Sequence, residues 1–229
     1  MRIYILPGWQ QNSTHWEDVV SLLSGAGHSA TAIDIPGFGT EPFIPECTTL
    51  EAIADWTQKK IQSMSQHEKF VLIGHSYGGR ITAELAARHM SGLAGIILIG
   101  SPNLYRPDLS TRARKLLASL LKPISRFVPD TLKEQFRSTD YSAVRGQELQ
   151  TLFQNIITKD QTDRLSEIAI PTALICGSLD AQAPVRIAHE IHTRIKDSTL
   201  DLIDGVGHDV HLEKPQLLAA KINTYVESL

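Results

Sequence analysis

Short hydrophobic runs alternate along the chain with stretches whose hydrophobic residues recur every three or four positions, which is the spacing of one helix face. The runs predict six strands, at residues 2–6, 29–35, 69–74, 94–100, 172–177 and 198–203. Strands that alternate with helices are typical of a parallel sheet covered by helices on both faces. We therefore expect an α/β fold with a doubly wound, mainly parallel sheet of six strands.

Helix starts are marked by their residues. Residues 14–17 and 48–51 each fit a capping box of the form Thr-x-x-Glu. Pro215 suits the first turn of a last helix that ends near Ser228. Because no repeat or low-complexity tract divides the sequence, we expect a single domain over residues 1–229 with one insertion.

That insertion, at about residues 103–168, interrupts the alternation with several short helical patterns, and we predict that it is a helical lid. Leu116, Leu117 and Leu120 contribute to its apolar face, and prolines divide it. Within residues 103–137, basic side chains outnumber acidic ones by five; the basic ones are Arg106, Arg112, Arg114, Lys115, Lys122, Arg126, Lys133 and Arg137. This basic segment is either a solvated helical face or a site for an anionic substrate or an acidic carrier protein.

The composition is typical of a soluble globular protein, with 42% hydrophobic and 21% charged residues among 229. A formal net charge of -3 provides no general attraction to nucleic acid or anionic membranes, so we expect neither partner. The first hydrophobic run is too short for a signal-peptide core, and no long apolar stretch occurs, so we expect a cytoplasmic protein. Cys47 and Cys176 are expected to be free thiols rather than a disulfide.

The most informative motif is Gly-His-Ser-Tyr-Gly-Gly at residues 74–79, between a predicted strand and a predicted helix. It has the form Gly-x-Ser-x-Gly, for which roughly 0.1 chance matches are expected in such a chain. A serine on this turn, here Ser76, is forced outward at the carboxyl end of a parallel sheet, where a base can reach its hydroxyl. A Cβ at Gly74, Gly78 or Gly79 would collide where helix and strand approach each other.

Two further polar residues follow predicted strands in the same way. Asp180 ends the segment Gly-Ser-Leu-Asp after the run 172–177, and His208 ends Gly-Val-Gly-His after the run 198–203. A serine hydroxyl is a weak nucleophile until an imidazole removes its proton, and a carboxylate holds that imidazole in the correct tautomer. Ser76, His208 and Asp180 are therefore a candidate catalytic triad that needs no metal or cofactor.

On these motifs the chain resembles the α/β-hydrolase superfamily over essentially its whole length. The chain order Ser76, Asp180, His208 is that superfamily's order of nucleophile, acid and base. Residues 211–215, His-Leu-Glu-Lys-Pro, and residues 34–39, Asp-Ile-Pro-Gly-Phe-Gly, also resemble its motifs. The resemblance implies that Ser76 is the nucleophile, that His208 is the general base and then the general acid, and that Asp180 orients His208.

The chain departs from this superfamily in two places. The oxyanion loop has Pro7-Gly8-Trp9 where the family often has His-Gly, but the hole consists of backbone N–H groups, so we expect those of Trp9 and Tyr77 to form it. The Trp9 side chain is also a candidate wall of the substrate pocket. The strand hairpin that precedes the first strand in many members has no counterpart here, so we expect six parallel strands in the spatial order 2-1-3-4-5-6.

Other residues compete for these roles. Asp204 is the second candidate carboxylate, but it lies close before the candidate base, where shaping the loop is its expected role. His211 and His75 are expected to be structural. His189 and His192 lie three apart on a predicted helix, but no carboxylate or cysteine set completes a ligand group, so we expect no metal.

Together these residues predict a serine hydrolase that cleaves a carboxylic ester or a related acyl compound, a small-molecule acyl substrate, through an acyl-enzyme. Hydrolysis of a carbon–carbon bond, a thioester or an amide by the same triad is an alternative that the fold does not decide. A relative that binds a ligand in the same pocket without catalysis is the remaining alternative.

Overall fold

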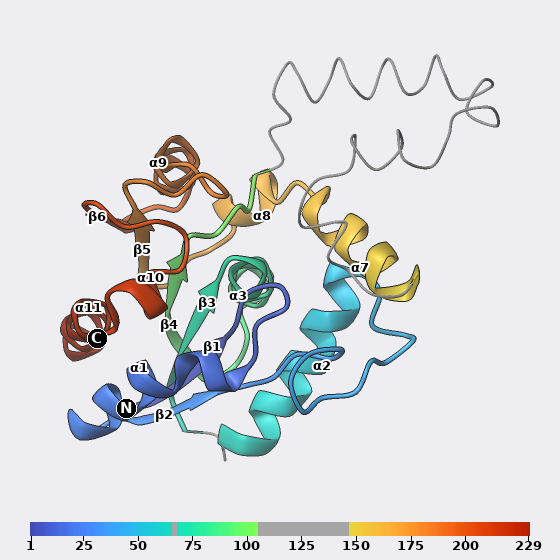
Figure 1. Cartoon of the computed structure of the whole chain (residues 1–229), viewed down its shortest axis with the longest axis horizontal. Helices are drawn as coiled ribbons and strands as arrows, with labels where there is room; N and C mark the ends of the chain where they lie inside the picture. The colour runs from blue at the N-terminus through green and yellow to red at the C-terminus, as the bar shows by residue number, and fades with distance from the viewer. Residues whose placement is uncertain (66–67, 105–146) are drawn as a thin grey trace.

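The computed structural model describes residues 1–65, 68–104 and 147–229, and the statements below concern these residues. They form a six-stranded sheet with helices on both faces (Figure 1). The strands are β1 (Arg2–Leu6), β2 (Ser29–Ala32), β3 (Phe70–His75), β4 (Leu93–Ile99), β5 (Thr172–Gly177) and β6 (Thr199–Ile203). The helices are the 3-10 turn η1 (Ser13–Trp16), α1 (Glu17–Gly25), α2 (Leu50–Ser65), α3 (Tyr77–Ala87), α7 (Gln147–Ile157), α8 (Thr162–Ser166), α9 (Val185–Arg194), α10 (Val210–Glu213) and α11 (Pro215–Glu227).

Every strand pairs with its neighbours in parallel, in the order β2-β1-β3-β4-β5-β6. The predicted fold class and strand order are confirmed. The chain places β2 on one side of β1 and then returns to the other side with β3. The loops after β1 and β3 consequently leave the carboxyl edge of the sheet side by side, which is where ligands bind in open α/β sheets.

Alternate residues of the strands face two hydrophobic cores, one on each face of the sheet. On β1, Tyr4 and Leu6 face the core that includes α2, α3 and α9, whereas Ile3 and Ile5 face the core that includes α1 and α11. All six residues of β3 are buried. Burial on both faces explains why this strand reads as a continuous hydrophobic run in the sequence.

Two predicted boundaries are wrong. β2 ends at Ala32 rather than at residue 35, because Asp34 turns from the ladder to accept hydrogen bonds from Ser13 N and Thr40 N. The first helical segment is capped by Asn12, whose side chain accepts a hydrogen bond from Thr14 N. Thr14, the predicted cap, therefore lies inside the segment as a donor.

Other predictions have mixed outcomes. Cys47 and Cys176 are free and buried, as expected. α7 and α8 fall within the predicted lid, whereas its basic side chains lie in residues 105–146, outside the described part of the chain. Of the helices that the structure describes, none combines the length and the apolar character needed to cross a membrane.

Asp34 joins the loop after β2 to the start of η1. Its Oδ1 accepts a hydrogen bond from Ser13 N at 2.6 Å, and its Oδ2 accepts two at 2.8 Å from N and Oγ1 of Thr40. Gly39 has a φ of 58°, and a Cβ there would overlap the Asp34 carboxylate. Burial by itself raises the pKa of Asp34, but these donors outweigh it and hold the pKa below its ordinary value.

We expect Asp34→Asn to lower the free energy of unfolding by about 1–3 kcal/mol at pH 7, because its amide NH₂ would face a donor in place of an accepting oxygen. Since the folded-state pKa of Asp34 is depressed, the advantage of the wild type is complete above the ordinary pKa of an aspartate and is lost as the pH falls through the folded-state pKa. Urea unfolding across this pH range measures both effects, with the exposed Asp197→Asn as the control. A difference that does not shrink on acidification would contradict this role of Asp34.

Candidate active site

Ser76 forms the tight turn between β3 and α3. Its φ of 50° and ψ of -111° lie in a region that residues other than glycine rarely occupy. Ser76 N donates a hydrogen bond to Ile99 O at 2.9 Å, which ties the turn to the end of β4. The neighbouring His75 and Tyr77 are buried, whereas Ser76 is partly exposed. The strained turn therefore presents the serine at the carboxyl edge of the sheet, as the motif predicts.

The glycines of this motif allow α3 to pack closely against the sheet. A Cβ on Gly78 would lie 2.6 Å from the carbonyl oxygen of Pro7, and one on Gly74 would overlap Thr82 Oγ1. A Cβ on Gly79 would overlap a side chain of the loop after β4. These contacts confirm the steric explanation, since a side chain at any of the three positions would push the helix away from the strands.

The candidate base and acid are joined directly. His208 Nδ1 lies 2.8 Å from Asp180 Oδ2, and the two side chains are 9% and 0% exposed. The other Asp180 oxygen accepts hydrogen bonds from the backbone N–H groups of Gln182 and Ala183, both at 2.8 Å. Three donors thus surround an acceptor-only carboxylate. With the His208 proton directed to Asp180, Nε2 is left as the basic nitrogen.

The three candidate residues follow β3, β5 and β6, so all three lie at the carboxyl edge of the sheet. Gly100, just after β4, passes beside the Asp180–His208 pair, since a Cβ there would lie 3.0 Å from Asp180 Oδ2 and 3.2 Å from His208 Nδ1. Within the described residues, the Ser76 hydroxyl makes no hydrogen bond to His208. Such catalytic hydrogen bonds often tighten only when substrate binds.

The N–H groups of Trp9 and Tyr77 are the expected oxyanion donors. Neither donates to an acceptor in the described part of the chain. The close contact of Gly78 with the carbonyl groups of Leu6 and Pro7 brings the N-terminus of α3 beside the loop that carries Trp9. This helix end adds partial positive charge where an oxyanion would form.

The Trp9 indole packs among aromatic side chains from three other segments. Its ring centroid lies 4.8 Å from that of Phe38, 5.3 Å from that of Tyr77 and 4.9 Å from that of Phe153 on α7. The buried Arg80 of α3 donates to two carbonyl groups at and just after the end of α7, at 3.2 and 2.6 Å. Trp9 thus sits in an aromatic wall beside the nucleophile turn, and α7 is anchored against it.

The competing residues have other partners. Asp204 is exposed and accepts a hydrogen bond from Ser178 Oγ at 3.1 Å, in the loop before the candidate base. His192 Nδ1 lies 2.9 Å from Ser198 Oγ, and His189 is exposed on the same helix, α9. Neither of these histidines belongs to a group of potential metal ligands within the described residues.

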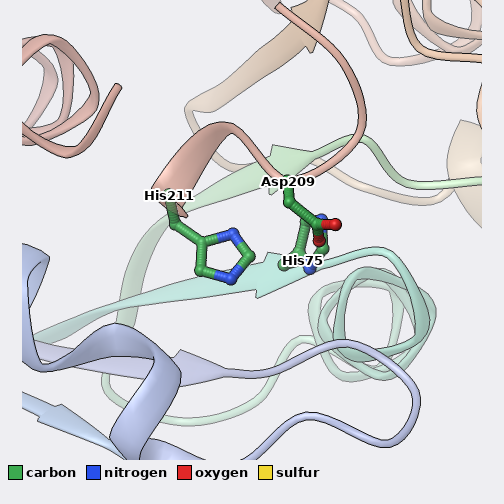
Figure 2. A group of neighbouring side chains, drawn as sticks. All are labelled: His75, Asp209 and His211. Atoms are coloured by element: carbon green, nitrogen blue, oxygen red, sulfur yellow. The ribbon is translucent and has the colours of Figure 1, made fainter. Parts of the chain in front are cut away.

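His75, Asp209 and His211 gather next to the candidate base (Figure 2), with potential ligand atoms within 4.8 Å of one another. Burial, with the nearby His208, lowers the pKa of His75 to about 3. Burial, with the nearby His75, lowers the pKa of His211 to about 3, so both rings are neutral at pH 7. His211 stacks on Trp16 at a centroid distance of 4.2 Å, and its ring nitrogens have no hydrogen-bond partner among the described residues.

Histidine and carboxylate groups are common metal ligands, but two members of this cluster already have other partners. His75 Nδ1 lies 3.1 Å from Gln11 Oε1, and its Nε2 lies 3.1 Å from His208 O. Asp209 Oδ1 accepts a hydrogen bond from Gln11 Nε2 at 2.8 Å. Because a metal ion would have to replace these contacts, we interpret the cluster as a connection between loops. The sequence analysis missed Gln11 and Asp209, since no motif indicates that they meet.

The chain belongs to the alpha/beta hydrolase family, whose model matches residues 3–221. It is 25% identical over 246 residues to the pimeloyl-[acyl-carrier protein] methyl ester esterase of Neisseria meningitidis serogroup B, covering 99% of this chain and 93% of that protein. Its fold is shared by a bromoperoxidase from Bacillus anthracis, with a TM-score of 0.78, 18% identity and coverage of 99% and 91% of the two chains. An esterase from Exiguobacterium antarcticum shares the fold with a TM-score of 0.77 and 20% identity, and the match covers 99% of this chain and 92% of that one. Fold and family together make this protein an enzyme of the α/β-hydrolase class.

Proposed function

We propose that the chain is a serine hydrolase that cleaves a carboxylic ester through an acyl-enzyme. The observation that carries this proposal is the 2.8 Å contact between His208 Nδ1 and Asp180 Oδ2 beside the strained turn of Ser76. A buried carboxylate–imidazole pair next to a serine on a strand-to-helix turn is the arrangement that acyl transfer to serine requires. The esterase names of related proteins agree with an ester as the scissile group.

In the proposed mechanism, Ser76 Oγ attacks the ester carbonyl while His208 Nε2 accepts its proton, and Asp180 stabilises the imidazolium. The backbone N–H groups of Trp9 and Tyr77 stabilise the negative oxygen of the tetrahedral intermediate. His208 then donates the proton to the leaving oxygen, so that an alcohol departs and Ser76 is acylated. Water, deprotonated by His208, attacks the acyl-enzyme and releases the carboxylic acid and free Ser76.

Labelling with a fluorophosphonate, followed by peptide mapping, tests this proposal directly. We expect one labelled serine, Ser76, and turnover of p-nitrophenyl esters. A panel of esters, acyl thioesters, amides and β-diketones distinguishes ester cleavage from the other reactions of the same triad. Folded protein that is not labelled at Ser76 would overturn the mechanism. Turnover of β-diketones and of no ester would show that the enzyme cleaves a carbon–carbon bond instead.

We further propose that the acyl group is presented by an acidic carrier protein. The relative from Neisseria meningitidis is named for a methyl ester of a carrier-bound pimeloyl group. Residues 103–137 of this chain carry eight basic and three acidic side chains, although the protein as a whole has a formal net charge of -3. A concentrated positive segment favours encounter with an acidic partner.

Reversal of two of these charges, Arg112→Glu with Arg114→Glu, is expected to raise the KM for an acyl-carrier methyl ester by roughly tenfold, because electrostatic attraction to the carrier is weakened. The kcat for the acyl-carrier ester should change little. The kcat and KM for neutral p-nitrophenyl esters should also change little, since those substrates carry no charge. Steady-state kinetics on both substrates measures the contrast. Reversal of the exposed Lys69 and Lys196 controls for the change in net charge. An equal rise in KM for both substrates would contradict a carrier site.

A further inference from the structure

Gln11 contacts three of the four segments that carry the proposed catalytic groups; the loop of Asp180 is the fourth. Its Oε1 accepts a hydrogen bond from Gly8 N at 3.1 Å and lies 3.1 Å from His75 Nδ1. Its Nε2 donates to Asp209 Oδ1 at 2.8 Å. The backbone of the same residue closes the turn, since Gln11 N donates to Gly8 O at 3.1 Å.

Each of these partners is a direct neighbour in the chain of a proposed catalytic group. Gly8 precedes Trp9 in the oxyanion loop, and His75 precedes the nucleophile. Asp209 follows the base. A displacement of the Gln11 amide would therefore move the oxyanion donor, the nucleophile and the base relative to one another.

The Gln11 amide is closely surrounded on its Gly8 side. A Cβ on Gly8 would lie 2.8 Å from His75 Nδ1 and 3.1 Å from Gln11 Oε1, so only glycine leaves the junction room. A flipped Gln11 amide would direct its NH₂ at the Gly8 N–H and its oxygen at the Asp209 carboxylate. The observed orientation is therefore the one in which each group meets an opposite partner.

His75 makes a second connection within the junction. Its Nε2 lies 3.1 Å from His208 O and 4.0 Å from Asp209 Oδ1, and Figure 2 shows the Asp209 carboxylate beside the His75 ring. A neutral imidazole has one N–H and donates to either Gln11 or the His208 carbonyl at a given moment. Gln11, in contrast, accepts from Gly8 N and donates to Asp209 Oδ1 at once, so it connects the oxyanion loop to the base loop in either tautomer of His75. It also bonds to His75 when Nδ1 carries the proton.

From these contacts we infer that Gln11 is a positioning residue, which holds the oxyanion loop, the nucleophile turn and the base loop in the relative placement that the reaction needs. The inference rests on the proposed serine-hydrolase mechanism. Gln11 itself touches no reacting atom and acts through Gly8, His75 and Asp209.

The test replaces Gln11 with methionine, which has a similar length and shape but removes the three side-chain contacts. We expect kcat for a p-nitrophenyl ester to fall by roughly 10- to 100-fold, with little change in KM. A loss of this size is expected when catalytic groups are displaced by up to about 1 Å. The exposed Gln62→Met is the matched control. Hydrogen exchange should become faster in residues 7–11 and 205–210 and remain unchanged in β3 and β4.

Substitutions at Asp209 test the connection from its other end. Asp209→Asn keeps an oxygen that accepts from Gln11, so it should retain more of kcat than Asp209→Ala. Combined with Gln11→Met, Asp209→Ala should cost less than the product of the two separate effects, because both break the same link.

The results that would overturn the role of Gln11 differ from those that would overturn the proposed function. Wild-type protein that is neither labelled nor active would overturn the proposed function, whereas hydrogen exchange would still show whether Gln11 holds the loops. An active wild type with unchanged kcat in Gln11→Met would overturn the inference. So would a rise in KM alone, or faster exchange throughout the protein, which would indicate a role in binding or in general stability.

Discussion

Replacement of Ser76 by alanine is expected to lower kcat for ester hydrolysis by roughly 10⁴- to 10⁶-fold and to abolish labelling by a fluorophosphonate. Without the Ser76 hydroxyl no acyl-enzyme forms, and only the oxyanion donors and substrate binding remain to accelerate attack by water. Alanine keeps the Cβ, so the strained backbone at φ 50° is neither relieved nor worsened. Thermal unfolding should therefore stay close to that of the wild type.

Ser63→Ala is the matched control, because Ser63 is an exposed serine of α2 whose hydroxyl donates to Lys60 O. It should retain full activity and full labelling at Ser76. A Ser76→Ala protein that is folded and still hydrolyses esters at the wild-type rate would show that another residue supplies the nucleophile.

Replacement of Asp180 by asparagine should have the second largest effect, a loss of roughly 10³- to 10⁴-fold in kcat. The Asp180 oxygen that accepts from Gln182 and Ala183 N–H would be retained, so the amide NH₂ would face His208 Nδ1. His208 would then carry its proton on Nε2, where it can no longer accept the proton of Ser76. Steady-state kinetics measures the loss, and the rate of fluorophosphonate labelling should fall with it.

Asp204→Asn is the control for Asp180→Asn, because Asp204 is the other carboxylate that follows a strand and precedes the base. Its oxygen accepts from Ser178 Oγ, a bond that an asparagine oxygen can keep, so activity should change little. If Asp204→Asn were the more damaging change, the roles assigned to the two carboxylates would have to be exchanged.

The sequence predicts the central strands well and the edge strand β2 less well. β3 is buried at all six positions, so its sequence is hydrophobic throughout and its extent is plain. β2, at the edge of the sheet, has no fully buried residue, and its sequence contains no sharp boundary. Its end depends on Asp34, whose partners are Ser13, at the start of η1, and Thr40, six residues further along the same loop.

The candidate site is likewise predictable only in part. The nucleophile turn is recognisable because sterics place glycines at fixed positions around Ser76, and these glycines are visible locally. The contacts of Gln11 have no local signal, since its side chain meets His75 and Asp209 across 64 and 198 residues. A glutamine in a polar loop is usually a solvated side chain, and nothing near it in the sequence distinguishes this one.

By itself, the sequence determined the class of fold and the position of the serine turn, because hydrophobic periodicity and the glycine motif are visible between residues close in the chain. The order of the strands followed from the resemblance to the α/β-hydrolase superfamily. Only the tertiary structure decided that Asp180 rather than Asp204 meets His208, and that Gln11 joins the loops around them. Those contacts depend on which strand ends lie next to one another and at what distance. Hydrogen bonds form only within about 3 Å, and the folded sheet is what brings such distant residues within that range.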